Sequence, residues 1–176
     1  SREKILNEIP PFLGGGEMIE DVFEEKSTWA ELPHKFEAGT PAIAEAIGLA
    51  EALKYIKKIG LNNINNYEKK ITQYLFNHLS NIENLHVIGP SPTNDHNRAS
   101  LAAFYVDNIH SNDIAEILDS KGVCIRSGHH CCQPLHRYLG LKSTARVSMN
   151  FTTSKEDIDI FVEKLQETID FLSFNS

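Results

Sequence analysis

The sequence has few cysteines, no basic block and no long hydrophobic run, and each absence excludes a class of protein. Three cysteines in 176 residues, two of them adjacent (Cys131 and Cys132), cannot build the disulfide framework of a small secreted protein. The 17 Lys and Arg against 24 Asp and Glu give a net charge of −7, and no basic segment could follow a phosphate backbone, which argues against a nucleic-acid partner. The longest apolar runs, such as 101–106, are far shorter than the ~20 residues that span a bilayer, so we expect no membrane partner.

What is present suffices for one sizeable core, because 41% of the residues are hydrophobic. Residues 10–42 contribute little to it. Pro10 and Pro11 are followed by glycines at 14–16 and a charged stretch over 17–26, without apolar periodicity. We expect this segment to be an irregular arm that packs against something else.

From residue 43 onward, apolar periodicity predicts helices alternating with short strands. The pattern is typical of an α/β fold of the α+β kind, with helices packed on a small mixed or antiparallel sheet. Cys124 is expected in the core, Ser111 as a helix N-cap, and Ser154 with Asp157 as a capping box. The strand 101–106 is expected to be central and covered on both faces. Helices are predicted at 42–60, 64–79, 111–121, 133–139 and 155–172, and strands at 85–88, 101–106, 123–126 and 145–150.

The reactive residue types concentrate between Arg126 and His136, where two histidines and two cysteines follow a predicted strand and precede a short helix. A thiol near a helix N-terminus, flanked by Arg and His, is stabilised as the nucleophilic thiolate. Composition alone leaves three interpretations open. The cysteines could be small buried hydrophobes, the loop could bind a metal, or one cysteine could be a catalytic nucleophile. The metal interpretation is weakened because the loop has no CxxC pair and consecutive side chains diverge, so we expect no metal site.

Residues 126–135 resemble the active-site signature of the SufS-type (group II) cysteine desulfurases, Arg-x-Gly-His-His-Cys-x-x-Pro-Leu. Four further segments are similar to the same family in the same order: 10–19, 36–41, 60–64 and 145–148. The resemblance covers essentially the whole chain. It implies a homodimeric enzyme on the fold-type-I aminotransferase scaffold that uses pyridoxal phosphate to convert L-cysteine into L-alanine and an enzyme-bound persulfide.

The resemblance also assigns roles by position. Cys131 would be the nucleophile that holds the persulfide, and Arg146 would bind the substrate carboxylate with support from Arg126. Gly39 and Thr40 would contact the cofactor phosphate of the neighbouring subunit. The loop residues His129 and His130 would support the site; His136 is expected at the surface, and Cys132 as a small side chain or a second sulfur acceptor. Either arginine could instead form a surface salt bridge, and Thr40 could cap the helix that follows.

The resemblance further divides the chain. Residues 1–42 would be the tail of a large cofactor-binding domain that is missing here, 43–60 a connecting helix, and 61–176 the small C-terminal domain with the cysteine loop. The Schiff-base lysine would lie outside this chain, so we expect the chain alone to be inactive. The persulfide sulfur would pass to an acceptor protein of the SufE or SufU kind for iron–sulfur cluster assembly, in a bacterial cytoplasm or plastid stroma rather than outside the cell. Two alternatives remain: a selenocysteine lyase on the same scaffold, and a non-catalytic sulfur-relay or partner-binding domain.

Overall fold

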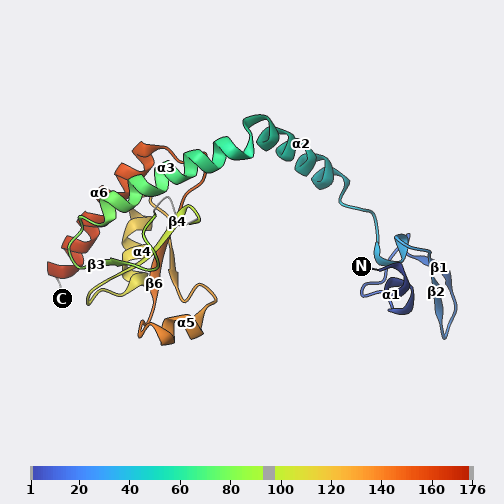
Figure 1. The fold of residues 1–176 in the computed structure, drawn as a ribbon. Coiled ribbons are helices and arrows are strands. Elements are labelled where there is room, and N and C mark those ends of the chain that lie inside the picture. Colours follow the sequence, from blue (N-terminus) through green and yellow to red (C-terminus); the bar gives the residue numbers. More distant parts are fainter. Residues whose placement is uncertain (1, 93–97, 175–176) are drawn as a thin grey trace. The chain divides into compact units, whose positions relative to one another are not determined.

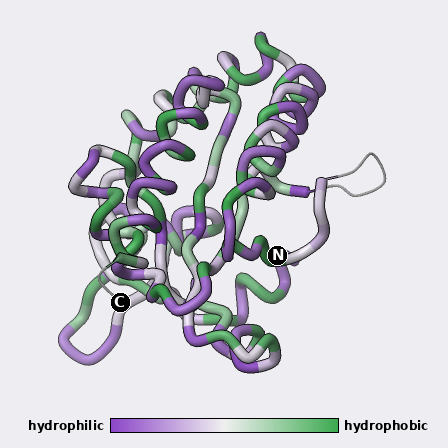
Figure 2. The backbone as a smooth tube through the Cα atoms, turned by 90° about the vertical axis from the view of Figure 1, so that its left-hand side faces the viewer, coloured by the Kyte–Doolittle hydropathy of each residue, from purple (hydrophilic) through white to green (hydrophobic). Residues whose placement is uncertain are grey.

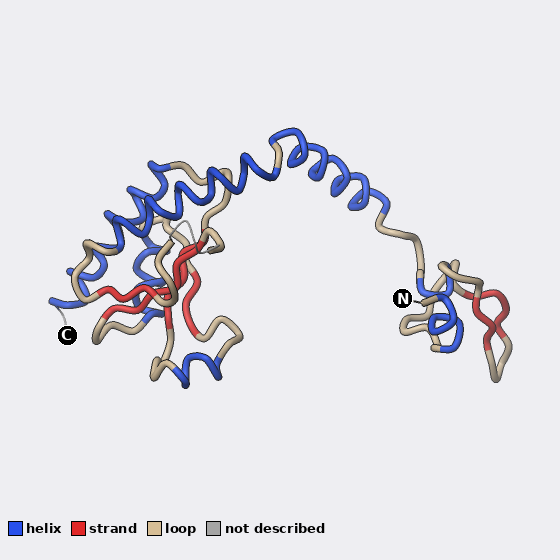
Figure 3. Tube along the Cα trace, in the orientation of Figure 1, coloured by secondary structure: helices blue, strands red, loops and turns tan. Residues whose placement is uncertain are grey.

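The computed structural model describes residues 2–92 and 98–174, and the chain divides into two compact units, 1–58 and 59–176. Figures 1 and 3 show their elements, with a two-stranded sheet in the first unit and a four-stranded sheet in the second. No helix within the described ranges is both long and apolar enough to span a membrane.

The first unit contains a β-hairpin that the sequence did not indicate. Strands β1 (Ile19–Val22) and β2 (Ser27–Trp29) pair antiparallel, between helix α1 (Glu3–Glu8) and the short 3₁₀ helix η1 (His34–Phe36). The expectation of an irregular arm over 10–42 is therefore wrong in this part. Because the side chains of β1 are half-buried or exposed, its sequence carries no alternation of apolar and polar residues.

Segments of the first unit that are distant in sequence contact each other at its glycines and at one lysine. The Gly39 N–H donates to the Gly16 carbonyl at 2.9 Å, and a Cβ on Gly15 would lie 3.3 Å from the Gly39 nitrogen. The Lys35 ammonium donates to the carbonyls of Leu6 and Asn7, at 3.2 and 3.0 Å. Helix α2 (Ile43–Ile59) follows and contains no buried residue. It begins three residues after Thr40, too far for the Thr40 side chain to act as its N-cap.

The second unit is a four-stranded antiparallel sheet in the order β3-β4-β6-β5, with helices packed on it (Figures 1 and 3). The predicted fold class is thereby confirmed, and the sheet is antiparallel throughout. Its elements are α3 (Leu61–Leu79), β3 (Leu85–Val87), β4 (Leu101–Val106), α4 (Ser111–Ser120), β5 (Arg126–Gly128), α5 (Gln133–Tyr138), β6 (Thr144–Ser148) and α6 (Lys155–Phe174).

The hydrophobic core lies on one face of this sheet, beneath α3, α4 and α6. Figure 2 shows apolar and polar residues alternating along helices of the chain. On β4, Ala102, Phe104 and Val106 are buried, whereas the intervening residues are only half-buried. The expectation that both faces of this strand are covered is therefore wrong for this chain. The core comprises Ile71, Leu75, Phe76, Leu79, Ile82, Ala102, Phe104, Val106, Ile114, Leu118, Ala145, Ile158, Phe161, Leu165 and Ile169.

Of the two predicted helix N-termini, the one at α6 is confirmed and the one at α4 is wrong. The predicted capping box is confirmed: the Ser154 N–H donates to the Asp157 carboxylate at 2.8 Å, and the Asp157 N–H donates to the Ser154 hydroxyl at 3.1 Å. The Ser154 N–H, together with the Ser154 hydroxyl that donates to the same carboxylate at 2.9 Å, lowers the pKa of Asp157. The N-cap of α4 is His110, whose Nδ1 accepts from the Asn112 N–H, and not the predicted Ser111. Ser111 is buried, and its hydroxyl donates to Ser143 at 2.7 Å.

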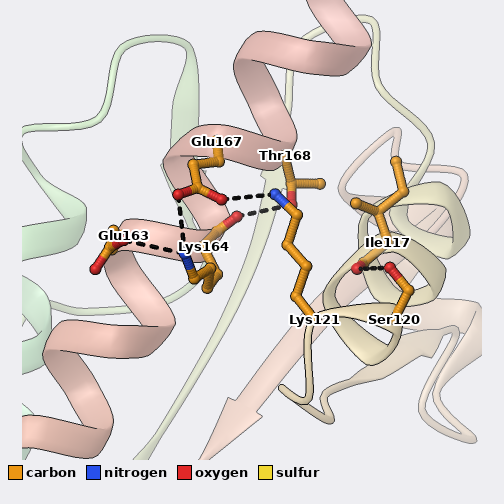
Figure 4. A network of polar contacts seen from close by, with 7 residues as sticks. All are labelled: Ile117, Ser120, Lys121, Glu163, Lys164, Glu167 and Thr168. Atoms are coloured by element: carbon orange, nitrogen blue, oxygen red, sulfur yellow. Dashed lines mark hydrogen bonds and ion pairs between the residues drawn. The ribbon is translucent and has the colours of Figure 1, made fainter.

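An ion network connects the end of α4 to α6 (Figure 4). Glu167 accepts from Lys121 at 2.8 Å and from Lys164 at 2.9 Å, and Lys164 also bonds Glu163. The two lysines lower the pKa of Glu167 to about 2. The network fixes the chain immediately before it turns toward β5.

Candidate active site

The predicted cysteine loop is a tight turn between β5 and α5. The Cys132 N–H donates to the His129 carbonyl at 2.8 Å, and the two residues between them, His130 and Cys131, have φ of 49° and 60°. Positive φ at both central positions is the pattern of a type I′ turn, which usually takes Gly, Asn or Asp. The turn follows Gly128, itself at φ 110°, and leaves Cys131 exposed.

Two arginines lie directly opposite each other beside this turn. In the antiparallel pairing of β5 with β6, Arg126 is the register partner of Arg146. Arg146 also pairs with Ala103 on β4, so both arginines lie on the sheet face opposite the core. In the described part of the chain neither guanidinium has an acidic partner, and the Arg146 Nε is buried without a hydrogen-bond acceptor. The Arg126 Nη2 lies 4.0 Å from the Cys131 sulfur.

This arrangement of the two arginines favours the binding of an anion. Like charges directly opposite on a sheet repel each other, and a buried N–H without a partner carries a desolvation cost. A carboxylate placed between the two guanidinium groups would remove both penalties, because it can accept several charge-assisted hydrogen bonds. Arg126 also places positive charge beside the Cys131 sulfur.

His130 is held in one tautomer on the inner side of the turn. Its Nε2 lies 3.1 Å from the Thr144 carbonyl, which can only accept, so Nε2 carries the proton. Burial lowers the pKa of His130, as do the nearby Arg146, His136 and Arg126, and these effects outweigh the bond to Thr144. The neutral ring therefore keeps a lone pair on Nδ1, which is buried and has no partner among the described residues.

Two residues of this site were missed or misplaced by the sequence analysis. His136, expected at the surface, is only 4% exposed, and Thr144 only 2%. The His136 Nε2 lies 3.1 Å from the Thr144 hydroxyl, and its Nδ1 lies 3.2 Å from the Cys132 carbonyl. One signal was available: His136 follows Cys132 by four residues, the spacing that puts two side chains on one face of a helix. Thr144 carries no signal of its own.

The remaining cysteines differ in their surroundings. The Cys132 thiol is half-buried and donates to the His129 carbonyl at 2.9 Å. Cys124, expected in the core, is exposed, and its thiol donates to Asp119 at 3.3 Å. This bond raises the pKa of Cys124, which disfavours the thiolate. Within residues 2–92 and 98–174 no group of three His, Cys, Asp or Glu side chains could hold a metal ion.

The structure therefore brings five of the candidate residues into one cluster, and places two elsewhere. Gly39 and Thr40 belong to the first unit, where Gly39 has φ 82° and Thr40 is exposed. Four of the other five line an open depression beside α5, which Figure 1 shows apart from α3 and α6, and the fifth, Arg146, is the register partner of Arg126. The depression is lined by Arg126, Ser127, His129, His130, Cys131, Gln133 and Pro134.

Comparison with known proteins identifies the fold to which this cluster belongs. The family model for class-V aminotransferases matches residues 1–161. The chain belongs to the aminotransferase class-V family. The probable cysteine desulfurase of Synechocystis sp. is 51% identical over 172 residues, covering 98% of this chain and 41% of that protein.

Solved structures agree with the class-V assignment. The apo cysteine desulfurase of Thermococcus onnurineus superimposes with a TM-score of 0.80 at 37% identity, over 96% of this chain and 42% of that one. The cysteine desulfurase CsdA of Escherichia coli, in its S-sulfonic acid form, gives a TM-score of 0.79 at 28% identity, over 97% and 41%. The chain thus spans about two fifths of the length of these relatives.

Proposed function

We propose that this chain is the C-terminal part of a SufS-type (group II) cysteine desulfurase, in which Cys131 removes sulfur from L-cysteine. One observation carries the proposal: an exposed cysteine on a left-handed turn lies next to two opposed arginines that have no acidic partner in the described part of the chain. The arginines suit the carboxylate of an amino acid, and the cysteine suits attack on its sulfur. The relatives named cysteine desulfurase support the same choice.

The reaction is a sulfur transfer that needs no external oxidant. The Cys131 thiolate attacks the substrate sulfur, an S–S bond forms and the substrate C–S bond breaks. The electron pair of the broken bond stays with the substrate carbon, which takes up a proton and becomes L-alanine. Cys131 retains the sulfur as a persulfide. Arg146 and Arg126 orient the substrate carboxylate, and neutral His130 keeps the turn in place without adding a third positive charge.

Pyridoxal phosphate, when bound, supplies the electron sink for this cleavage. Thr40 fits a phosphate contact, because its side chain is exposed next to a glycine in a left-handed conformation. The Gly39 N–H already donates to Gly16, so the Thr40 hydroxyl is the group offered. Lys35, whose ammonium donates to two backbone carbonyls, does not suit covalent attachment of the cofactor. As the family resemblance implies, we assign the Schiff-base lysine to a domain outside this chain, with 1–42 as the tail of that domain, 43–60 as a connecting helix and 61–176 as the small domain.

The assembly and the destination of the sulfur are part of the same proposal. The enzyme would act as a homodimer, in a bacterial cytoplasm or plastid stroma. The exposed position of Cys131 suits a small acceptor protein of the SufE or SufU kind, which would collect the persulfide sulfur for iron–sulfur cluster assembly. A selenocysteine lyase would use the same residues, and the relative rates on the two amino acids would separate the two activities.

The test is a persulfide map of the full-length protein that carries this chain. The protein is loaded with pyridoxal phosphate, treated with L-cysteine and alkylated, and the additional sulfur is located by peptide mass. We expect it on Cys131, and its loss in Cys131→Ser but not in Cys124→Ser, the matched control at an exposed thiol. Sulfur on Cys132 alone would reassign the nucleophile. No sulfur on any cysteine, with the cofactor bound, would refute the desulfurase assignment and favour a relay domain.

A further inference from the structure

We propose that Thr144 and His136 are positioning residues that lock the left-handed turn at His130 and Cys131, and so hold the Cys131 thiol beside Arg126. The contacts that would form this lock are present in the described structure whatever reaction the protein catalyses. Only the consequence of the lock for sulfur transfer rests on the proposed function.

The turn needs to be held because its conformation is unfavourable for the residues that occupy it. His130 and Cys131 both have a Cβ, and both have positive φ. A left-handed conformation is disfavoured by steric contact between the Cβ and the backbone, and two such residues in succession are uncommon outside Gly, Asn and Asp. Residues in such conformations persist only where the surrounding structure fixes them.

Thr144 fixes the turn from both of its ends. Its carbonyl accepts from the His130 Nε2 at 3.1 Å, on the residue before the nucleophile. Its hydroxyl bonds the His136 Nε2 at 3.1 Å, and the other nitrogen of that ring lies 3.2 Å from the Cys132 carbonyl, on the residue after the nucleophile. One residue of β6 therefore restrains both neighbours of Cys131.

The position of Thr144 is rigid, and its polar groups serve this turn. Thr144 is the register partner of Gly128, the last residue of β5 before the loop, so the strand pairing sets its distance from the turn. Thr144 and His136 are both buried, and on β6 it is the adjacent Ala145, not Thr144, that faces the hydrophobic cluster under the helices. Removing the Thr144 hydroxyl should therefore loosen the turn without opening a cavity in that core.

The experiment measures the alkylation rate of Cys131 by peptide mass in the full-length holoenzyme without substrate, with Cys124 as an internal reference. Cys131 is already exposed, so its rate reports how the turn orients its sulfur beside Arg126 and not whether the reagent can reach it. The variants are Thr144→Val, which keeps the shape and the carbonyl, and Thr144→Ser, which keeps the hydroxyl. Thr168→Val is the matched control, because Thr168 is fully buried and its hydroxyl donates to Lys164 within α6.

We expect Thr144→Val to slow alkylation of Cys131 by about fivefold, the effect of one neutral hydrogen bond on a population. Thr144→Ser should restore the rate to within about twofold, and Thr168→Val should not change it. His136→Asn, which can keep the contact to Cys132 but not the one to Thr144, should slow alkylation as much as Thr144→Val. It also serves as the second variant if Thr144→Val does not fold.

Three results would overturn the lock. The first is wild-type reactivity of Cys131 in Thr144→Val, or in His136→Asn if Thr144→Val does not fold. The other two are a Thr144→Ser variant that is as slow as Thr144→Val, and an equal loss of reactivity in Thr168→Val. Failure of the proposed function is a separate outcome. Persulfide formation from L-cysteine, measured on the same samples, should fall in proportion to alkylation. If alkylation responds as expected but even the wild type forms no persulfide, the lock holds and the desulfurase assignment fails.

Discussion

Replacing Arg146 with methionine should stabilise the chain while it weakens the site. Arg146 faces Arg126 across β5 and β6, and its Nε is buried without an acceptor in the described part of the chain. Methionine keeps an unbranched apolar stem of similar length and removes both the charge and the unpartnered N–H. An arginine that contributed to folding would show the opposite result, because its loss would remove favourable contacts.

Two contributions set the size of the effect on stability. A buried N–H without an acceptor costs about 1–3 kcal/mol, and like charges directly opposite on a sheet cost up to about 1 kcal/mol. Arg146 is half-buried, which keeps the sum near the lower end, at about 1–2 kcal/mol. At about 3 °C per kcal/mol for a chain of this length, Tm should rise by about 3–6 °C.

The assay compares thermal unfolding of the chain, followed by circular dichroism, for Arg146→Met and for Arg137→Met. Arg137 is exposed on α5, so its replacement controls for the loss of one positive charge. In the full-length enzyme the same Arg146→Met should lower kcat/KM for L-cysteine by roughly ten- to a hundredfold, the effect of losing a charge-assisted hydrogen bond. A lower Tm for Arg146→Met than for the wild type would refute the reasoning, because it would reveal a favourable partner for this guanidinium.

Three further predictions concern titrating groups outside this pair. Because the pKa of His130 lies below its ordinary value of 6.5, the free energy of unfolding should decline as the pH falls through 6.5. Chemical denaturation should show a weaker decline in His130→Asn, since asparagine tolerates the positive φ at this position. The depressed pKa of Glu167 contributes stability above 4.5 that is lost as the pH falls to about 2, so Glu167→Gln should lower Tm at pH 7 but not at pH 2. Asp119→Asn should accelerate alkylation of Cys124 at neutral pH, because the carboxylate that raises its pKa is gone, while Cys131 alkylation stays constant.

The elements that pack on the core were predictable, because burial leaves a periodic pattern in the sequence. Helix α3 was found from Ile71, Leu75 and Leu79, which recur every four residues and are buried together. The helix predicted at 111–121 ends at Ser120, and Gly122 follows it with φ of 79°. The hairpin β1–β2 was missed because its strands are short and largely exposed, so no alternation marks them.

The candidate site was predictable as a set of residues but not as a geometry. The loop was found because its residue types are unusual together, whereas its left-handed turn and the role of Thr144 depend on contacts between distant strands. Cys124 was placed in the core because a strand was predicted at 123–126. In the structure the Val123 N–H still donates to the Leu118 carbonyl at the end of α4, so strand pairing begins only at Arg126 and the thiol stays exposed.

The pleat of the sheet separates folding from chemistry along a single strand. On β6, Ala145 faces the core, whereas Thr144 and Arg146 face the opposite side with Arg126. Substitutions on one side therefore change the packing of the core with little effect on the reactive loop, and substitutions on the other side change the loop and its charges without changing that packing. Such a division gives an evolving protein room to alter its reactive loop without first acquiring compensating mutations in the hydrophobic interior.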